Sequence, residues 1–147
     1  MSEHILDEEQ FVKNNLRRRD LLPTWIKLFT WVFLIFGAIT PIVFVLGIVG
    51  INGNISLYGL ETNQPLSLMG MAITLLFLIK GVVAFGLWTE KKWAVYFAIA
   101  DAVIGIIVCI IVMVTLPSPF MRLELIPLIL YLRKMVKIKP QWMKILD

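Results

Sequence analysis

Three long apolar segments constrain this chain more than any other feature of its sequence. They cover residues 24–49, 66–88 and 93–116, and each contains a single charged side chain. A helix rises about 1.5 Å per residue, so each segment is long enough to cross roughly 30 Å of hydrocarbon. The sequence therefore predicts at least three transmembrane helices.

A fourth segment, residues 120–136, is less clearly a membrane span. It contains Arg122, Glu124, Arg133 and Lys134 among its apolar residues. By length alone it would also fit a helix that lies in the membrane interface. The chain as a whole has 59% hydrophobic and 16% charged residues, whereas soluble domains average about 45–50% and about 25%. This composition excludes an ordinary soluble fold.

The positions of the basic residues decide how often the chain crosses the membrane. Twelve of its 14 Lys and Arg residues fall before or in the first turn of the first span, between spans two and three, or after residue 132. Such segments are expected on the cytoplasmic side by the positive-inside rule, and a fourth crossing is needed to bring the last of them there. We therefore predict an all-α membrane protein. It is a four-transmembrane-helix bundle with up-down-up-down topology and cytoplasmic N- and C-termini.

These segments divide the chain without leaving room for a second domain. Residues 1–23 are predicted to form a charged, amphipathic cytoplasmic tail, and residues 137–147 a basic one. The localisation expected is integral to the membrane and multi-pass, in the cytoplasmic membrane if the source is bacterial. Four aromatic side chains fall where this topology puts the inner interface, as expected of amphipathic rings at headgroup level; they are Trp25, Trp88, Trp93 and Tyr131.

The short turn between spans two and three predicts which residues lie at equal depth. It joins Trp88 to Trp93, so the two helices must be antiparallel neighbours. Lys80 precedes Trp88 by eight residues and Asp101 follows Trp93 by eight, which puts each about 12 Å below the inner surface. Opposite charges at one depth on adjoining helices predict an ion pair.

Two further charges are expected near this depth if Arg133 marks the inner end of the fourth span. Glu124 would then lie about 13.5 Å deep and Arg122 about 16.5 Å deep. Unpaired charges at the centre of a membrane helix are unfavourable by roughly 2.5–3.5 kcal/mol each, which favours pairing. The alternative is that Lys80 and Arg122 extend separately to the surface, as long side chains do near helix ends. The predicted intramembrane charge cluster is Lys80, Asp101, Arg122 and Glu124.

Small residues on the third span predict close helix packing around Asp101. Ala94, Ala98 and Ala102 recur every four residues, and Gly105 lies four residues beyond Asp101. Such small-residue faces let the backbones of membrane helices approach one another. The charge pair is therefore expected to be buried, either as a structural contact or as part of a proton or ion relay.

No motif for catalysis, metal binding or cofactor binding is found, so we expect a protein that is not an enzyme. There is no GxSxG, HExxH or phosphate-loop motif, and the single histidine and single cysteine exclude multi-histidine and thiolate metal sites within one chain. An acidic dyad of Asp101 and Glu124 is the remaining catalytic arrangement, but Lys80 beside it would keep Asp101 ionised. Arg17–Arg19 are interpreted as a topology determinant, so nucleic acid is not an expected partner.

Two functions of different classes agree with this pattern. The first is a non-catalytic accessory or scaffold subunit of a membrane complex, whose partners are the lipid bilayer and another membrane protein or a second copy of itself. The alternative is a minimal oligomeric transporter or channel that uses the intramembrane charges.

Overall fold

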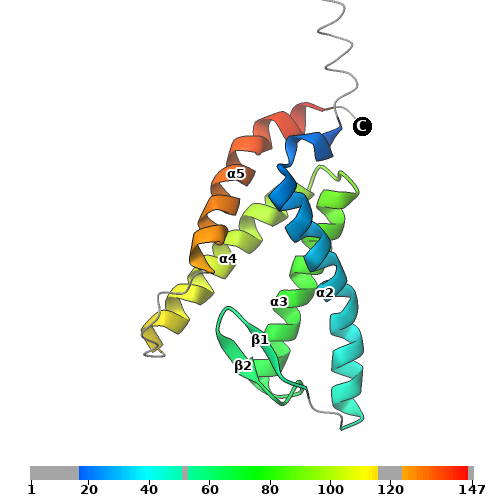
Figure 1. The fold of residues 1–147 in the computed structure, drawn as a ribbon, viewed down its shortest axis with the longest axis vertical. Helices are drawn as coiled ribbons and strands as arrows, with labels where there is room; N and C mark the ends of the chain where they lie inside the picture. Colours follow the sequence, from blue (N-terminus) through cyan, green and yellow to red (C-terminus); the bar gives the residue numbers. More distant parts are fainter. Residues whose placement is uncertain (1–16, 51–52, 116–123, 146–147) are drawn as a thin grey trace, which may run out of the picture.

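The chain is mainly helical in the computed structural model, which describes residues 17–50, 53–115 and 124–145 (Figure 1). In chain order the elements are η1 (Arg18–Leu21), α2 (Thr24–Ile48), β1 (Ile55–Leu57), β2 (Leu60–Thr62), α3 (Leu68–Trp88), α4 (Ala94–Thr115) and α5 (Leu125–Lys144). Helices α2, α3 and α4 are long and apolar enough to cross a membrane. The predicted helical class is thus confirmed, and the three helices are candidate spans that correspond to the three clear apolar segments.

Local sequence signals account for the ends of these helices. Pro23 precedes α2 with extended backbone, and its missing N–H is one that the first turn of a helix could not pair. Ser67 caps α3, since its Oγ accepts a hydrogen bond from the backbone N of Gly70 at 3.1 Å. The α3–α4 turn (residues 89–93) contains Glu90 at a φ of 60°, in the left-handed region.

Helices α2 and α3 cross where both lack a side chain. A Cβ on Gly37 would lie 2.5 Å from the Cα of Gly81, and one on Gly81 would lie 2.8 Å from the Cα of Gly37. Neither atom could be accommodated without moving a helix. The two glycines therefore set the closest approach of α2 to α3, as small residues do between membrane helices.

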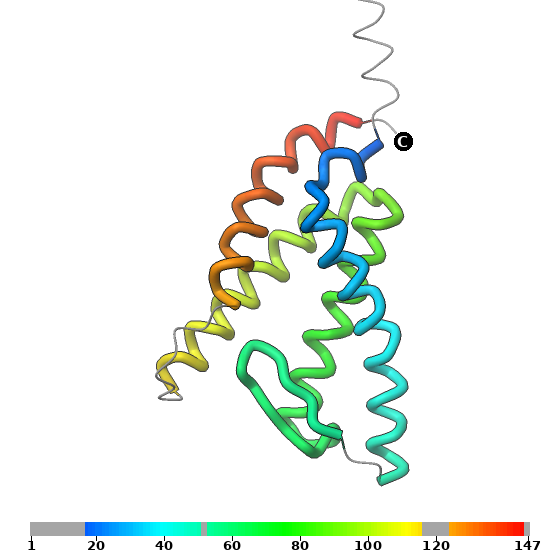
Figure 2. Tube along the Cα trace, viewed as in Figure 1, coloured from blue at the N-terminus to red at the C-terminus, as the bar shows by residue number. Residues whose placement is uncertain are grey.

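Successive helices pack on one another, α2 on α3, α3 on α4, and α4 on α5. Figure 2 shows that the α2–α3 and α4–α5 pairs diverge from one end of the molecule, with the β1–β2 hairpin between them at the open end. The start of the described chain, the α3–α4 turn and the end of α5 gather at the closed end. The main hydrophobic core lies there and comprises Leu22, Ile26, Val83, Leu87, Ala94, Val95, Ala98, Met135, Ile138 and Trp142.

Helix α5 differs in extent from the predicted fourth span. It begins at Leu125 and continues to Lys144, through most of the segment that was expected to be a tail. The reason is that Met135, Ile138 and Trp142 fall on one helical face and are buried in the core. The basic residues lie mostly on the other side of the helix. Residues 120–123 of the predicted span lie outside the described residues.

The segment between α2 and α3 forms a β-hairpin. Strands β1 and β2 are antiparallel, with Ile55 opposite Thr62 and Leu57 opposite Leu60. Tyr58 and Gly59 form the turn, with φ values of 54° and 79°. Both central residues therefore adopt the left-handed conformation of the two-residue turns that match strand twist.

Candidate functional site

Lys80 of α3 and Asp101 of α4 meet between their helices. The Lys80 Nζ lies 2.8 Å from the Asp101 Oδ2, and the two side chains are only 3% and 8% exposed. Both residues were expected at equal depth because the turn between α3 and α4 is short. Each charge is thus removed from solvent and compensated by the other.

Two aromatic rings enclose the Lys80 ammonium from other elements. Its Nζ lies 4.9 Å from the ring centroid of Phe33 in α2 and 4.9 Å from that of Tyr58 in the hairpin. The negative face of an aromatic ring attracts a cation, and the attraction grows when water is excluded. The charge on Lys80 is therefore stabilised from three directions.

Tyr58 reaches the centre of the bundle from the tip of the hairpin. Non-glycine residues adopt a positive φ only at some energetic cost, and a turn of this kind favours Asn or Gly at that position. The side chain compensates by burial, since Tyr58 is 6% exposed and lies against Lys80. Burial, and to a smaller extent the negative charge of Asp101, raises the pKa of the Tyr58 phenol above its usual value.

Gly105 makes the room that the Tyr58 ring needs. A Cβ at Gly105 would lie 2.5 Å from the Tyr58 hydroxyl and 3.1 Å from the Leu128 Cδ2 of α5. The hydroxyl is buried at this point, yet it has no hydrogen-bond partner among the described residues. Such an atom is unusual, because a buried polar group without a partner is destabilising.

A cavity of about 200 Å³ adjoins the ion pair. Its wall is mostly apolar and takes residues from every helix and from β1. The lining residues are Trp25, Phe29, Thr30, Phe33, Leu57, Tyr58, Lys80, Val83, Ala84, Leu87, Asp101, Glu124, Pro127, Leu128 and Tyr131. The pair and Tyr58 thus border a partly open cavity between the helices.

The small residues of α4 lie at two different contacts. Ala94, Ala98 and Ala102 are each 0% exposed, and the first two belong to the core that includes Met135 of α5. Gly105 faces the hairpin through Tyr58. The predicted small-residue face is therefore occupied within the chain by α5 and by the hairpin.

Glu124 forms no salt bridge with Lys80 among the described residues. Glu124 is exposed at the start of α5 and lines the cavity. Arg122 lies outside the described residues. The expected common layer used Arg133 as the inner end of the fourth span. Helix α5 continues past Arg133 to Lys144, and Trp142, nine residues beyond Arg133, contacts the α3–α4 turn.

The aromatic residues expected at the inner interface occupy different surroundings. Trp25 and Trp93 are 37% and 38% exposed, and Trp88 packs at 4.7 Å between centroids against Trp31. Tyr131 instead lines the cavity. It lies about 16 Å along α5 from Trp142, so the longer helix carries it away from the inner end where it was expected.

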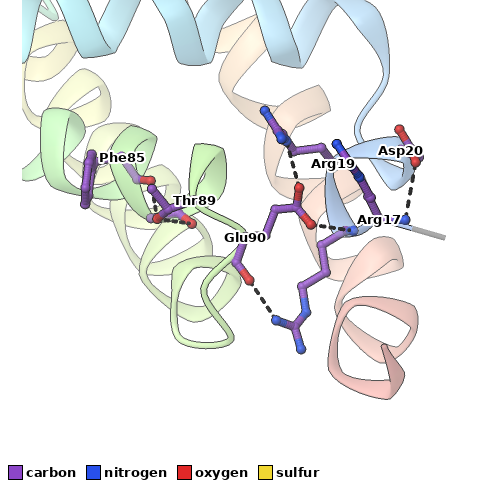
Figure 3. Close-up of polar contacts among 8 residues, drawn as sticks. Arg17, Arg19, Asp20, Phe85, Thr89 and Glu90 are labelled. Atoms are coloured by element: carbon purple, nitrogen blue, oxygen red, sulfur yellow. Dashed lines mark hydrogen bonds and ion pairs between the residues drawn. The ribbon is translucent and has the colours of Figure 1, made fainter. Parts of the chain in front are cut away.

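Arg18 forms a clasp at the closed end of the molecule. It is 4% exposed, and its guanidinium donates to the carbonyl oxygens of Glu90 at 2.7 Å, of Trp142 at 3.1 Å and of Ile145. The Glu90 carboxylate accepts from the Arg18 backbone N at 3.1 Å and from the Arg19 Nε at 2.7 Å. Figure 3 shows Glu90 facing Arg19 across this junction.

The Trp142 indole completes the clasp by donating from Nε1 to the Lys91 carbonyl at 3.0 Å. The segment before α2, the α3–α4 turn and the end of α5 are therefore joined by hydrogen bonds. Sequence reasoning identified Arg18 only as a topology determinant and missed Glu90 and Trp142, because no local pattern reports contacts across the whole chain. The hairpin left only a partial signal, since Gly59 suits the second position of a two-residue turn but Tyr58 is not a residue typical of the first.

The described residues offer no group of three or more His, Cys, Asp or Glu side chains that could hold a metal ion. Among these residues, the polar side chains of the cavity are instead the Lys80–Asp101 salt bridge, a second carboxylate, a threonine hydroxyl and two phenol hydroxyls. Such an arrangement can bind a polar group through hydrogen bonds.

The clasp yields the first testable prediction. Arg18→Met removes the donors to three carbonyl oxygens and should lower the free energy of unfolding by about 2–3 kcal/mol. Hydrogen exchange of residues 136–145 should become faster, as measured by mass spectrometry in detergent. Arg17→Met is the matched control, because Arg17 is exposed and bonds to Asp20 through its backbone N. Equal effects of the two substitutions would contradict the clasp.

Comparison with known proteins agrees with the membrane assignment. Residues 54–126 match the model of a family described as "Predicted membrane protein (DUF2127)". No curated protein and no solved structure matches the chain. The matched segment runs from the hairpin to the first turn of α5, so it includes Lys80, Asp101 and Tyr58. The chain is thus a membrane protein with apolar helical spans, similar over this segment to a family whose function is unknown.

Proposed function

We propose that the chain crosses the bilayer four times, with both termini on the cytoplasmic side. The clasp supports this topology, because Arg18 and Trp142 both bond to the α3–α4 turn. Helix α4 leaves this turn and α5 returns to it, so the two helices traverse the same layer in opposite directions. The basic residues expected inside, such as Lys91 and Lys144, belong to this end of the molecule.

The amphipathic half of α5 fits the inner headgroup region. Met135, Ile138 and Trp142 face the core, whereas Arg133 and Lys137 are exposed. Lysine and arginine side chains extend towards headgroups while their methylene groups cover apolar surface. The low overall hydropathy of α5 is therefore compatible with a crossing helix whose inner end is basic.

Labelling of single cysteines tests this topology. In a Cys109→Ser background, Glu61→Cys should react with a membrane-impermeant maleimide in intact cells, because the hairpin is proposed to face outward. Gln141→Cys should react only after the cells are permeabilised. Both native side chains are exposed in the structure, so neither site is hidden by packing. Reaction of Gln141→Cys in intact cells would contradict the four crossings.

The role that the structure supports best is that of a non-catalytic accessory or scaffold subunit in a membrane complex. The observation that carries this proposal is the exposure of α2, which is the least buried of the three apolar helices. It is held chiefly by α3, and Ile35, Ile39 and Ile42 on one of its faces are 53%, 44% and 59% exposed. A helix presented in this way can pack against the spans of a larger partner.

Native mass spectrometry of the protein purified in a mild detergent tests this role. A larger partner should accompany the wild type in fixed stoichiometry. Replacing Ile35, Ile39 and Ile42 together by Ala should release the partner, since it removes the packing surface and adds no polar group. The melting temperature of the isolated protein should change little, because these side chains are exposed.

The matched control uses α4, where Ile104, Ile107 and Ile111 are 41%, 50% and 54% exposed. Their replacement by Ala removes an apolar surface of the same kind from α4, which is not proposed to contact the partner. Release of the partner by the α4 variant alone would contradict the role of α2. Recovery of a pure homo-oligomer would contradict the accessory role itself.

The second candidate is a minimal oligomeric transporter or channel. The observation that favours it is the cavity beside the buried Lys80–Asp101 pair. A homo-oligomer would then conduct ions or protons in liposomes, and the double variant Lys80→Met/Asp101→Leu would stop the flux. An accessory subunit would conduct nothing in either form.

A further inference from the structure

We propose that the cavity beside the ion pair binds the hydroxyl end of an uncharged amphipathic lipid or alcohol. This inference does not depend on the accessory role, since a bound lipid of this kind would occupy the protein with or without a partner. It rests on the charges, on an unpaired buried hydroxyl, and on the shape of the cavity.

The charges bordering the cavity favour a guest that is neutral. Lys80 and Asp101 compensate each other at 2.8 Å and are almost fully buried. A guest that carried its own charge would add an uncompensated charge to a mostly apolar site, which is strongly unfavourable. Glu124 also lines the cavity, but its side chain is exposed. Polar groups outside the cavity can therefore solvate its charge.

The hydrogen-bonding groups of the wall favour a hydroxyl over a neutral group that only accepts hydrogen bonds. An ammonium has three N–H donors, and Lys80 gives one of them to Asp101 Oδ2. The Asp101 carboxylate can accept further hydrogen bonds beyond that one. A hydroxyl both donates and accepts, so it can bond to both members of the pair, whereas a carbonyl can bond only to Lys80.

Tyr58 is an independent indication that the wall of the cavity has a polar group without a hydrogen-bond partner. It is 94% buried, lines the cavity, and within the described part of the chain its hydroxyl has no hydrogen-bond partner. Buried hydroxyls in native proteins are nearly always paired with protein, water or ligand. A polar group bound in the cavity would place a hydrogen-bonding group on the side of the bundle where the Tyr58 hydroxyl lies.

The size and opening of the cavity fit the end of a lipid rather than a whole small molecule. A volume of about 200 Å³ holds roughly seven non-hydrogen atoms at about 30 Å³ each. Trp25 and Phe29 line the cavity and are 37% and 40% exposed, so the wall continues to the surface of α2. The hydroxyl and its first carbons would lie inside, and the remaining chain would leave along α2 into the bilayer.

Photolabelling with a diazirine derivative of 1-decanol tests the proposal on the full chain in detergent. Mass spectrometry should find the label on wall residues such as Phe33 or Leu128. Unlabelled decanol should compete at a concentration roughly tenfold lower than decane, decanoate or decyltrimethylammonium. Equal or better competition by any of these three would overturn the proposal. Label confined to lipid-facing residues outside the wall would overturn it as well.

Two variants separate the cavity from the surrounding lipid surface. Ala84→Leu fills the cavity, because Ala84 lines it and is 2% exposed, and should reduce labelling of the wall roughly tenfold. Val82→Leu on the same helix is the control, since Val82 is 55% exposed and absent from the wall. Equal labelling of the two variants would overturn the assignment to this cavity.

The double variant Lys80→Met/Asp101→Leu tests the recognition of the hydroxyl without relying on Ala84→Leu to fold. It replaces the pair by apolar residues, a change that buried pairs often tolerate. Decanol should then lose its advantage over decane as a competitor. A double variant that keeps the preference for decanol would overturn the role of the pair.

Discussion

Two opposite charges in the hydrocarbon region must be paired, and this constraint organises the centre of the molecule. Lys80 and Asp101 are too deeply buried to be solvated, so α3 and α4 are held in the register that brings Nζ and Oδ2 within 2.8 Å. Phe33 from α2 and Tyr58 from the hairpin then close around the ammonium. Helices α2, α3 and α4 and the hairpin are thereby positioned around this ion pair.

The two ends of the bundle are built differently. At the closed end, Arg18, Glu90 and Trp142 join three distant segments by hydrogen bonds over a well-packed core. Towards the other end the helix pairs diverge, and the hairpin lies between them (Figure 1). A closed end joined by hydrogen bonds and an open end completed by a hairpin leave space beside the ion pair. The cavity follows from this architecture.

The sequence predicts those parts of the structure that depend on local patterns. Apolar segments of sufficient length identified α2, α3 and α4, which the structure confirms as candidate spans. The short turn after Trp88 sufficed to place Lys80 and Asp101 at one depth, because the helical rise is constant. The structure puts these two side chains in contact.

The remaining features depend on contacts between distant residues. The C-terminal end of α5 is set by burial of Trp142 against the α3–α4 turn, whereas the sequence alone suggests Arg133 as the end of the fourth span. Tyr58 enters the bundle because Gly105, 47 positions later, leaves space for it. Neither relation leaves a periodic pattern in the sequence.

A double-mutant cycle on the ion pair tests the central claim most directly. The free energies of unfolding of the wild type, Lys80→Met, Asp101→Leu and the double variant would be measured in the same mild detergent. Each single substitution should destabilise the fold by about 3–5 kcal/mol, because it leaves one buried charge alone. The double variant should lose much less than the sum of the two. Additive losses would contradict the account, since they would mean that the two side chains do not interact.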